Sequence, residues 1–149
     1  PFFCQEEFFM QPYEHKAQYY ETDRMGIIHH SNYIRWFEEA RVDFLEQIGM
    51  PFETVEARGL SSPVLSVACE YKGMTRFGET VRITVSVLSY TGAKLSLAYR
   101  VEDAGTGALR CTGQSSHCFL NESGRPVSLR RAAPDYDAVL SALAEQAKR

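Results

Sequence analysis

The chain has 149 residues, of which 44% are hydrophobic and 23% charged, and its formal net charge is −3. This composition is that of a globular protein, so we expect one domain over residues 1–149 and no extensive disorder. The slightly negative charge excludes a general nucleic-acid binder. No run of 18 apolar residues occurs, and the first ten residues contain no basic residue. We therefore expect neither a membrane-spanning helix nor a signal peptide.

Strand-forming residues occur near Tyr13 to Tyr20. The first element that the pattern of apolar residues clearly predicts is a helix from Ser31 to Ile48. Apolar residues recur at helical spacing on one face: Tyr33, Trp36, Phe37, Ala40, Phe44 and Ile48. Such spacing is typical of a helix with one side on a core. Gly49 and Pro51 end it, since glycine favours a left-handed cap and proline cannot continue the helix. Residues 51–59 add a further turn or two.

Beyond residue 59 the apolar residues alternate with polar ones, which is typical of half-buried strands. The alternating sets are Leu65, Val67, Cys69 and Tyr71; Val81, Ile83, Val85 and Val87; and Leu95, Leu97, Tyr99 and Val101. A further strand is expected from Ala108 to Leu120, and short glycine-bearing segments near residues 90–93 and 103–107 predict tight connections. A last helix begins near Pro134, with Tyr136, Leu140, Leu143 and Ala147 on one face.

One strand, a long helix and four further strands indicate an α+β fold with an antiparallel sheet of about five strands. An antiparallel sheet has one face to cover. The helix from Ser31 is the only long and strongly apolar candidate, and Trp36, Phe37 and Phe44 make it bulky. We therefore expect a sheet that curls around this one central helix.

The four cysteines lie far apart and form no CxxC pair: Cys4, Cys69, Cys111 and Cys118. A structural zinc site needs closely spaced ligand pairs, and a small secreted domain usually carries more cysteines. We interpret them as reduced core residues of a cytoplasmic protein.

Candidate chemistry is concentrated in the segment that joins the first strand to the central helix. Asp23, His29 and His30 lie within eight residues, and Gly26 would let the backbone approach a ligand closely. The first turn of a helix has unpaired N–H groups and a positive dipole end, which could stabilise an oxyanion. A carboxylate opposite could be a nucleophile or a general base. This combination indicates an acyl-transfer site.

Structural roles are open for the same residues. Asp23 could form an Asx-turn, His30 could cap the helix, and His29 could face solvent. Ser31 is an ordinary N-cap residue, so capping is the favoured interpretation for its side chain. A metal site of Asp23, His29 and His30 is disfavoured because adjacent histidines at a helix start point in different directions.

The segment from Asp23 to Tyr33, DRMGIIHHSNY, resembles the hotdog-fold acyl-CoA thioesterases of the 4-hydroxybenzoyl-CoA thioesterase type. It is most similar to the short-chain bacterial branch, whose loop reads D-x-x-G-V-V-Y-H-x-x-Y. The likeness extends from Tyr13 to Leu120 and includes Tyr71 to Glu79, YKGMTRFGE, where the family tends to have Y-x-x-P-A-R-x-x-D. Two departures are His29 in place of the branch's Tyr, and Gly73-Met74-Thr75 in place of the Pro-Ala step.

The resemblance implies a hotdog fold and hydrolysis of a small or medium acyl-CoA. It makes Asp23 the catalytic nucleophile or general base and His30 a catalytic residue that orients substrate or water. Backbone N–H groups around His30 and Ser31 would hold the thioester oxygen. The residues implied in substrate binding are Gly26, His29, Ser31 and Tyr33. Coenzyme A is then part of the substrate, and neither a cofactor nor a metal is implied. Family members form dimers, often paired into tetramers, with active sites between subunits.

Three alternatives stay open at this point. Within the fold, Glu38 or Glu39 on the central helix could replace Asp23, although both lie about two turns beyond the helix start. An enoyl-thioester hydratase could use a similar Asp/His pair. A non-enzymatic acyl-CoA-binding protein could keep the fold without turnover, because fold alone does not establish function.

Overall fold

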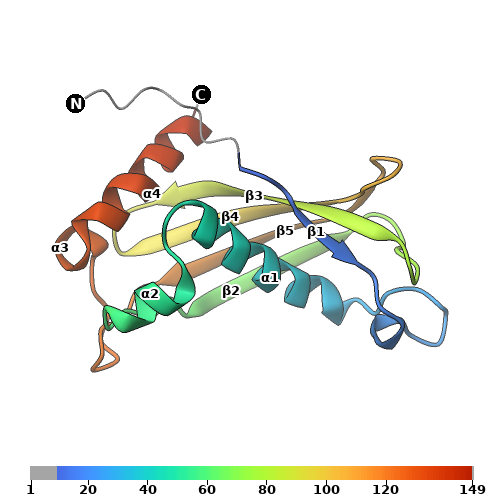
Figure 1. Ribbon diagram of the computed structural model, residues 1–149, viewed down its shortest axis with the longest axis horizontal. Coiled ribbons are helices and arrows are strands. Elements are labelled where there is room, and N and C mark those ends of the chain that lie inside the picture. The colour runs from blue at the N-terminus through green and yellow to red at the C-terminus, as the bar shows by residue number, and fades with distance from the viewer. Residues whose placement is uncertain (1–9, 149) are drawn as a thin grey trace.

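The computed structural model describes residues 10–148. The elements follow one another in this order: β1 (Tyr13–Lys16), a 3₁₀ turn η1 (Tyr19–Glu21), α1 (Ser31–Gln47), α2 (Phe52–Ala57), β2 (Val64–Tyr71), β3 (Thr80–Tyr90), β4 (Lys94–Asp103), β5 (Leu109–Cys118), α3 (Leu129–Ala132) and α4 (Pro134–Ala147) (Figure 1). The predicted long helix is therefore confirmed within one residue at its end, and the predicted order of one strand, a helix and four strands is confirmed as well.

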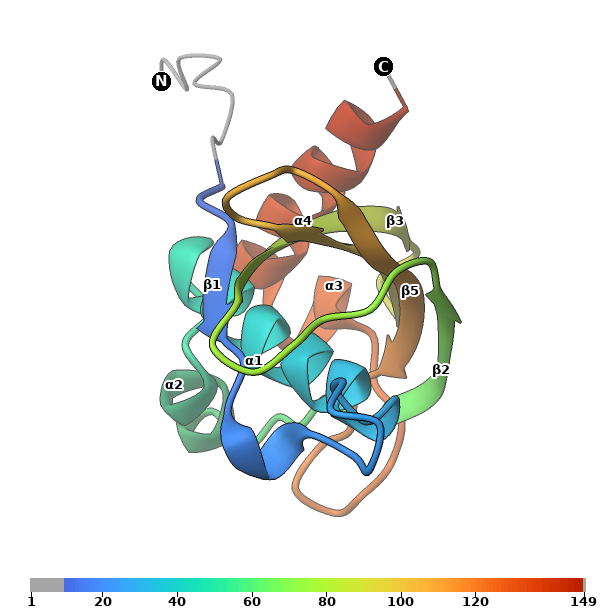
Figure 2. The same cartoon turned by 90° about the vertical axis from the view of Figure 1, so that its right-hand side faces the viewer.

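The five strands form one sheet in the order β1-β3-β4-β5-β2, and every neighbouring pair is antiparallel. The sheet curls around α1, with β1 on one side of the helix and β2 on the other (Figure 2). This is the α+β hotdog architecture that the sequence predicted. β1 and β2 stand at the two ends of this strand order, so both are edge strands.

The core lies between α1 and the concave face of the sheet. Trp36 and Phe37 of α1 are fully or almost fully buried, as are the inward-facing side chains of β3 and β4, among them Ile83 and Leu97. The inward positions of these two strands are those that the alternating pattern predicted. Burial of each such side chain contributes about 1.5–3 kcal/mol to folding, and this packing fixes α1 against the sheet.

Phe37 of α1 packs directly against Gly113 of β5. A Cβ atom at Gly113 would overlap the ring of Phe37, which also stacks on Tyr99 at a centroid separation of 4.5 Å. Glycine is required here by space, not by backbone conformation.

Three predicted features differ in detail. β1 ends at Lys16, because the chain turns into η1, where the backbone N–H of Gln18 donates to the side chain of Glu21. The C-terminal helix is preceded by the separate short helix α3. Ala147, which we expected on the buried face of that last helix, is exposed, and Ala144 is buried in its place.

The largest difference concerns β2, which we expected to be half-buried. Its apolar side chains are 40–53% exposed: Val64, Leu65, Val67 and Tyr71. The period-two pattern is present, but the chain covers only part of this edge: Tyr71 packs on Tyr33 of α1, and Cys69 packs against the core. Ile34 of α1 is also exposed.

No helix within residues 10–148 is long and apolar enough to cross a membrane. Cys69, Cys111 and Cys118 are free thiols, as expected of reduced core cysteines, and Cys111 is fully buried. Cys4 lies outside the described residues.

We predict that Gly113→Ala lowers the free energy of unfolding by roughly 1–3 kcal/mol, the usual penalty for overpacking a core. The added methyl group must displace Phe37 or the strand. Urea unfolding followed by circular dichroism measures the change. Gln114→Ala, at the exposed neighbouring position, is the control and should unfold as the wild type does. Equal stability of Gly113→Ala and wild type would contradict the packing argument.

Candidate active site

The loop between η1 and α1 is a compact turn with its own hydrogen bonds. Thr22 and Ile28 form an isolated antiparallel bridge, and the N–H of Asp23 donates to the carbonyl of Ile27 at 2.8 Å. Gly26 has a φ of +77°, a value that residues with a Cβ atom rarely adopt. The turn therefore depends on this glycine, which holds the ends of the loop together.

Glu21 anchors the loop to the rest of the protein. Its buried carboxylate accepts hydrogen bonds from Trp36 Nε1 at 2.6 Å, from His15 Nε2 at 2.8 Å and from the N–H of Gln18. Burial alone would raise the pKa of Glu21, but these hydrogen bonds outweigh it and the pKa lies below its usual value. The carboxylate is thus kept ionised between β1 and α1.

The backbone of Glu21 makes a second set of contacts. Its carbonyl accepts from the N–H of His29 at 2.9 Å and from Asn32 Nδ2 at 2.8 Å. One residue therefore fixes both ends of the loop and the first turn of α1. This arrangement positions Asp23 and His30 relative to the helix N-terminus.

A cleft of about 410 Å³ opens beside this loop. Three of the predicted site residues line it: Asp23, His30 and Tyr33. The opposite wall comes from the end of β2 and the following segment, with Tyr71, Lys72 and Met74 among its residues. Gly26, His29 and Ser31, which the sequence also suggested, adjoin the cleft through their chain neighbours without lining it.

Asp23 is half-buried, and its two carboxylate oxygens differ in their hydrogen bonding. Oδ1 accepts the N–H of Met25 at 2.8 Å and so closes the Asx-turn that was one of the two interpretations. Oδ2 has no hydrogen-bond partner within residues 10–148. The Asx-turn consequently uses one oxygen of Asp23 and leaves the other without a partner among the described residues.

The histidines lie at the start of α1. Their rings stack at a centroid separation of 4.1 Å, and His29 Nδ1 lies 2.8 Å from Ser31 Oγ. Ser31 was expected to be the N-cap, but the N-cap is His30 and Ser31 is the first helical residue. The hydroxyl of Ser31 contacts the His29 ring and makes no capping hydrogen bond to the helix backbone. The N–H of His30 has no acceptor in the described part of the chain, and that of Ser31 makes only a 3.2 Å contact with His29 Nδ1.

Tyr33 faces inward below the cleft. Its hydroxyl donates to Thr75 Oγ1 at 2.9 Å, and burial raises the pKa of the phenol. Tyr71 packs on Tyr33 edge to face, and its hydroxyl donates to the carbonyl of His30 at 3.0 Å. Burial, followed by its neighbour Cys69, raises the pKa of Tyr71 to about 12. Both phenols are therefore neutral donors near pH 7.

Tyr71 and Thr75 were not among the residues predicted for the site. Tyr71 ends β2 and Thr75 lies in the segment that follows, about 40 residues from the loop, and the sequence indicated this part of the chain only through its resemblance to the family. The carbonyl of Thr75 accepts the N–H of Ile28 at 2.8 Å, so this segment and the loop before α1 are joined directly.

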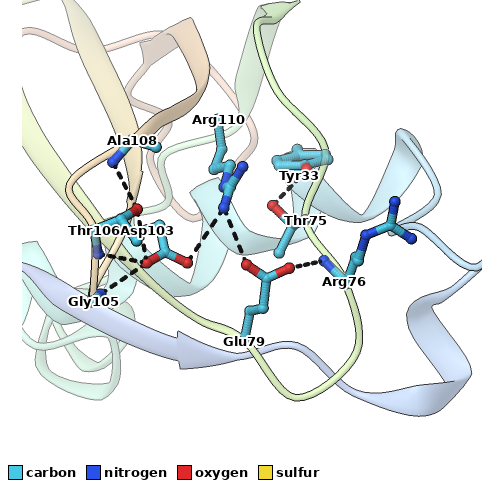
Figure 3. A network of polar contacts seen from close by, with 9 residues as sticks. All are labelled: Tyr33, Thr75, Arg76, Glu79, Asp103, Gly105, Thr106, Ala108 and Arg110. Atoms are coloured by element: carbon cyan, nitrogen blue, oxygen red, sulfur yellow. Dashed lines mark hydrogen bonds and ion pairs between the residues drawn. The ribbon is translucent and has the colours of Figure 1, made fainter.

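A polar network supports the segment from behind (Figure 3). Arg110 on β5 bonds Glu79 at 3.1 Å and approaches Asp103 at 3.5 Å, while Glu79 accepts the N–H of Arg76 at 2.7 Å. Asp103 is itself held by the N–H groups of Thr106 and Gly105, and these contacts lower the pKa of Asp103 to about 2 although burial opposes them. The wall of the cleft is thereby tied to the β4–β5 connection.

The alternative carboxylates do not belong to the cleft. Glu39 accepts a hydrogen bond from the hydroxyl of Tyr13 at 3.0 Å, and His15 Nδ1 lies 3.0 Å from the same carboxylate. Glu38 is exposed on α1 and does not line the cleft. Within residues 10–148, no group of three or more His, Cys, Asp or Glu side chains is arranged to hold a metal ion.

Comparisons with known proteins agree with this architecture. The sequence model of the thioesterase-like superfamily matches residues 18–143. The putative acyl-CoA thioesterase YneP of Bacillus subtilis is 34% identical over 83% of this chain and 89% of its own. The structure of a DHNA-CoA thioesterase from Staphylococcus aureus superposes with a TM-score of 0.88 at 30% identity, covering 93% of each chain. A Thermus thermophilus protein of unassigned function, TT1821, superposes with a TM-score of 0.82 at 35% identity, covering 90% of this chain and 99% of its own.

The chain therefore belongs to the thioesterase-like superfamily. The sequence prediction of an acyl-CoA thioesterase with a hotdog fold is confirmed at the level of the family.

We predict that Asp103→Asn lowers the free energy of unfolding at pH 7, because the N–H groups of Thr106 and Gly105, and Arg110 beside them, lose a negatively charged partner. The folded-state pKa of about 2 lies below the unfolded value of about 3.9. The stabilisation is therefore fully present above about pH 4 and is lost as the pH falls towards 2. Urea unfolding should show a difference in the free energy of unfolding between variant and wild type at pH 7. This difference should disappear as the pH falls from about 4 to 2.

Glu38→Gln, an exposed carboxylate outside the network, is the matched control and should leave stability nearly unchanged. A gap between Asp103→Asn and wild type that stays constant down to pH 2 would contradict the role of the ionised carboxylate.

Proposed function

We propose that this protein hydrolyses small or medium acyl-CoA thioesters to the free acid and CoA, with Asp23 as the catalytic carboxylate. The observation that carries the proposal is the free Oδ2 of Asp23 in a cleft that also contains the start of α1. Membership of the thioesterase-like superfamily supports the reaction class. We further propose a cytoplasmic location, consistent with the free thiols of the described residues.

The chemistry proceeds by one of two routes from the same carboxylate. Asp23 either attacks the thioester carbon directly, forming an anhydride that water then opens, or removes a proton from an attacking water. Both routes place negative charge on the carbonyl oxygen before the CoA thiolate leaves. The uncommitted N–H of His30 and the dipole of α1 would stabilise that charge, and the N–H of Ser31 could join if His29 moves.

His30 is proposed to orient the substrate or the water. Its ring lies edge-on to Tyr71 at a centroid separation of 6.1 Å, and Tyr71 also holds its carbonyl. The hydrogen bond from Tyr71 thus holds the backbone of His30 at the start of α1. Gly26, His29, Ser31 and Tyr33 stay in the proposal as residues that shape the loop around the substrate.

The acyl pocket is proposed to lie against the apolar part of the cleft, where Met25, Ile27 and Met74 meet the aromatic rings. Methionine side chains adapt to different shapes, so the lining suits aliphatic and aromatic acyl groups. The Staphylococcus aureus relative is described as a DHNA-CoA thioesterase, and an aromatic acyl-CoA therefore belongs among the substrates to test.

We propose that the active protein is a dimer of two copies of this chain. The resemblance to the family implies that two such dimers could pair into a tetramer. The edge strand β2 carries exposed apolar side chains, and Ile34 of α1 is exposed as well. An exposed apolar edge strand is prone to pair with another chain. Tyr71, at the end of β2, also lines the cleft, so a second copy paired on this edge would complete its wall.

We predict that Asp23→Asn lowers thiol release at least about a hundredfold, the usual effect of losing an acid–base or nucleophilic group. Asparagine keeps the acceptor of the Asx-turn, so the loop retains its shape. The substrates are acetyl-, butyryl-, hexanoyl-, palmitoyl-, benzoyl- and 1,4-dihydroxy-2-naphthoyl-CoA. Glu38→Gln is the matched control and should keep wild-type activity.

The alternatives give different results in the same assay. Loss of enoyl absorbance without thiol release would indicate a hydratase. Binding of acyl-CoA with no turnover by the wild type would indicate a binding protein. Equal rates for wild type and Asp23→Asn would refute the role of this carboxylate. A loss of activity in Glu38→Gln would assign the catalytic role to Glu38 on α1.

We predict that Val67→Asp converts a dimer into a monomer and reduces thiol release, because it buries a charge in the proposed contact. Ala68→Asp places the same charge on the opposite face of β2 and should leave the dimer intact. Analytical ultracentrifugation distinguishes the states. A wild-type protein that is monomeric and fully active would overturn the proposed assembly.

A further inference from the structure

Arg41 of α1 carries a buried charge that no acidic side chain neutralises. The residue is only 9% exposed, and its Nη1 lies 3.1 Å from His117 Nδ1 on β5. Within residues 10–148 it forms no ion pair with a carboxylate, and its Nε and Nη2 atoms have no hydrogen-bond partner. An unpaired buried charge is strongly unfavourable.

The contact with His117 does not compensate the charge. Burial and the neighbouring guanidinium lower the pKa of His117 to about 4, so the ring is neutral at pH 7. Its Nδ1 accepts from Arg41, and its Nε2 bonds Ser115 Oγ at 2.7 Å, which in turn bonds the hydroxyl of Tyr99 at 2.7 Å. The ring thus serves as an acceptor in a neutral chain.

A small cavity lies beside Arg41, between α1, α2, β4, β5 and α4. Its walls are mainly apolar, with Leu45, Met50, Leu60, Leu95, Phe119 and Leu129 among the lining residues. Among the polar lining residues, Tyr136 has a buried hydroxyl with no hydrogen-bond partner in the described chain. Glu56, Ser61 and Ser62 also line the cavity, and Glu56 and Ser61 are exposed to water.

Arg41, which has no carboxylate partner among the described residues, and the unpartnered hydroxyl of Tyr136 therefore line one cavity. The space is about 20 Å³, which holds a single water-sized species. Water would satisfy the hydrogen bonds but leave the charge of Arg41 uncompensated, whereas an anion does both. An organic acid with an apolar tail exceeds this volume.

We propose that this cavity binds one small monovalent anion of about the size of chloride, held by Arg41 and Tyr136. The site shares no lining residue with the cleft of Asp23. Its anion would join α1 to α4 and neutralise the interior charge, so its effect is on stability and not on the thioesterase reaction.

The first test measures the thermal midpoint, Tm, of the full chain in potassium gluconate, progressively replaced by potassium chloride at constant ionic strength. Gluconate is too large for the cavity. Binding stabilises the folded state in proportion to the logarithm of anion concentration over Kd, so Tm should rise by about 3 °C or more at ten times Kd. An equal Tm in both salts would overturn the proposal.

Variants locate the effect. Tyr136→Phe removes one donor and keeps the ring, and should weaken the chloride dependence of Tm; Arg41→Gln should abolish it. Arg131→Gln, an exposed arginine of α3, is the control and should respond as the wild type does. A chloride response that persists unchanged in Tyr136→Phe and Arg41→Gln would refute this site.

Crystals of the wild type soaked in bromide provide a direct test that does not depend on how the variants fold. An anomalous peak is expected within hydrogen-bond distance of Arg41 and Tyr136. Density for water alone at that position, without an anomalous peak, would overturn the proposal. Neither result depends on the catalytic role of Asp23, which the thiol-release assay tests separately.

Discussion

The structure depends on one buried carboxylate, that of Glu21. Its side chain accepts hydrogen bonds from β1, from η1 and from Trp36 in the middle of the core, while its backbone carbonyl holds the loop and the first turn of α1. Removing such a group leaves several buried donors without partners, which costs far more than the net value of one hydrogen bond. The position of the proposed catalytic loop is thus a consequence of the core and not of the loop's own sequence.

Much of the fold follows from local patterns. The spacing of apolar residues in α1 and in β3 and β4 reflects a core that lies within one chain, and for these elements the periodicity alone was sufficient. The same reasoning misjudged β2, because alternation records which side chains are apolar and not what covers them. An edge strand with 40–53% exposed apolar residues fits a surface whose covering lies outside the single chain.

Some residues of the candidate site could likewise be predicted from local patterns, and others could not. Asp23, His30 and Tyr33 lie within eleven residues of one another, and their placement in one cleft could be predicted from the loop and the start of the helix. Tyr71 and Thr75 could not, since their contacts join segments about 40 residues apart and depend on how the sheet curls. Ser31 also illustrates a limit of local reasoning: its hydroxyl bonds His29, so the expected cap is absent although the helix begins where predicted.

The number of hydrogen bonds that each polar group makes separates the proposed roles of Glu21, Asp23 and Arg41. The carboxylate of Glu21 has a full set of donors and leaves no room for a ligand, which is the behaviour of a structural group. Asp23, by contrast, uses one oxygen for the turn and keeps the other in an open cleft, and Arg41 keeps two nitrogens uncommitted beside a cavity. Buried polar groups are nearly always paired. In the two proposals made above, such unused hydrogen-bonding capacity with adjoining space is filled by a substrate at Asp23, in the loop before α1, and by an ion at Arg41, on α1 itself.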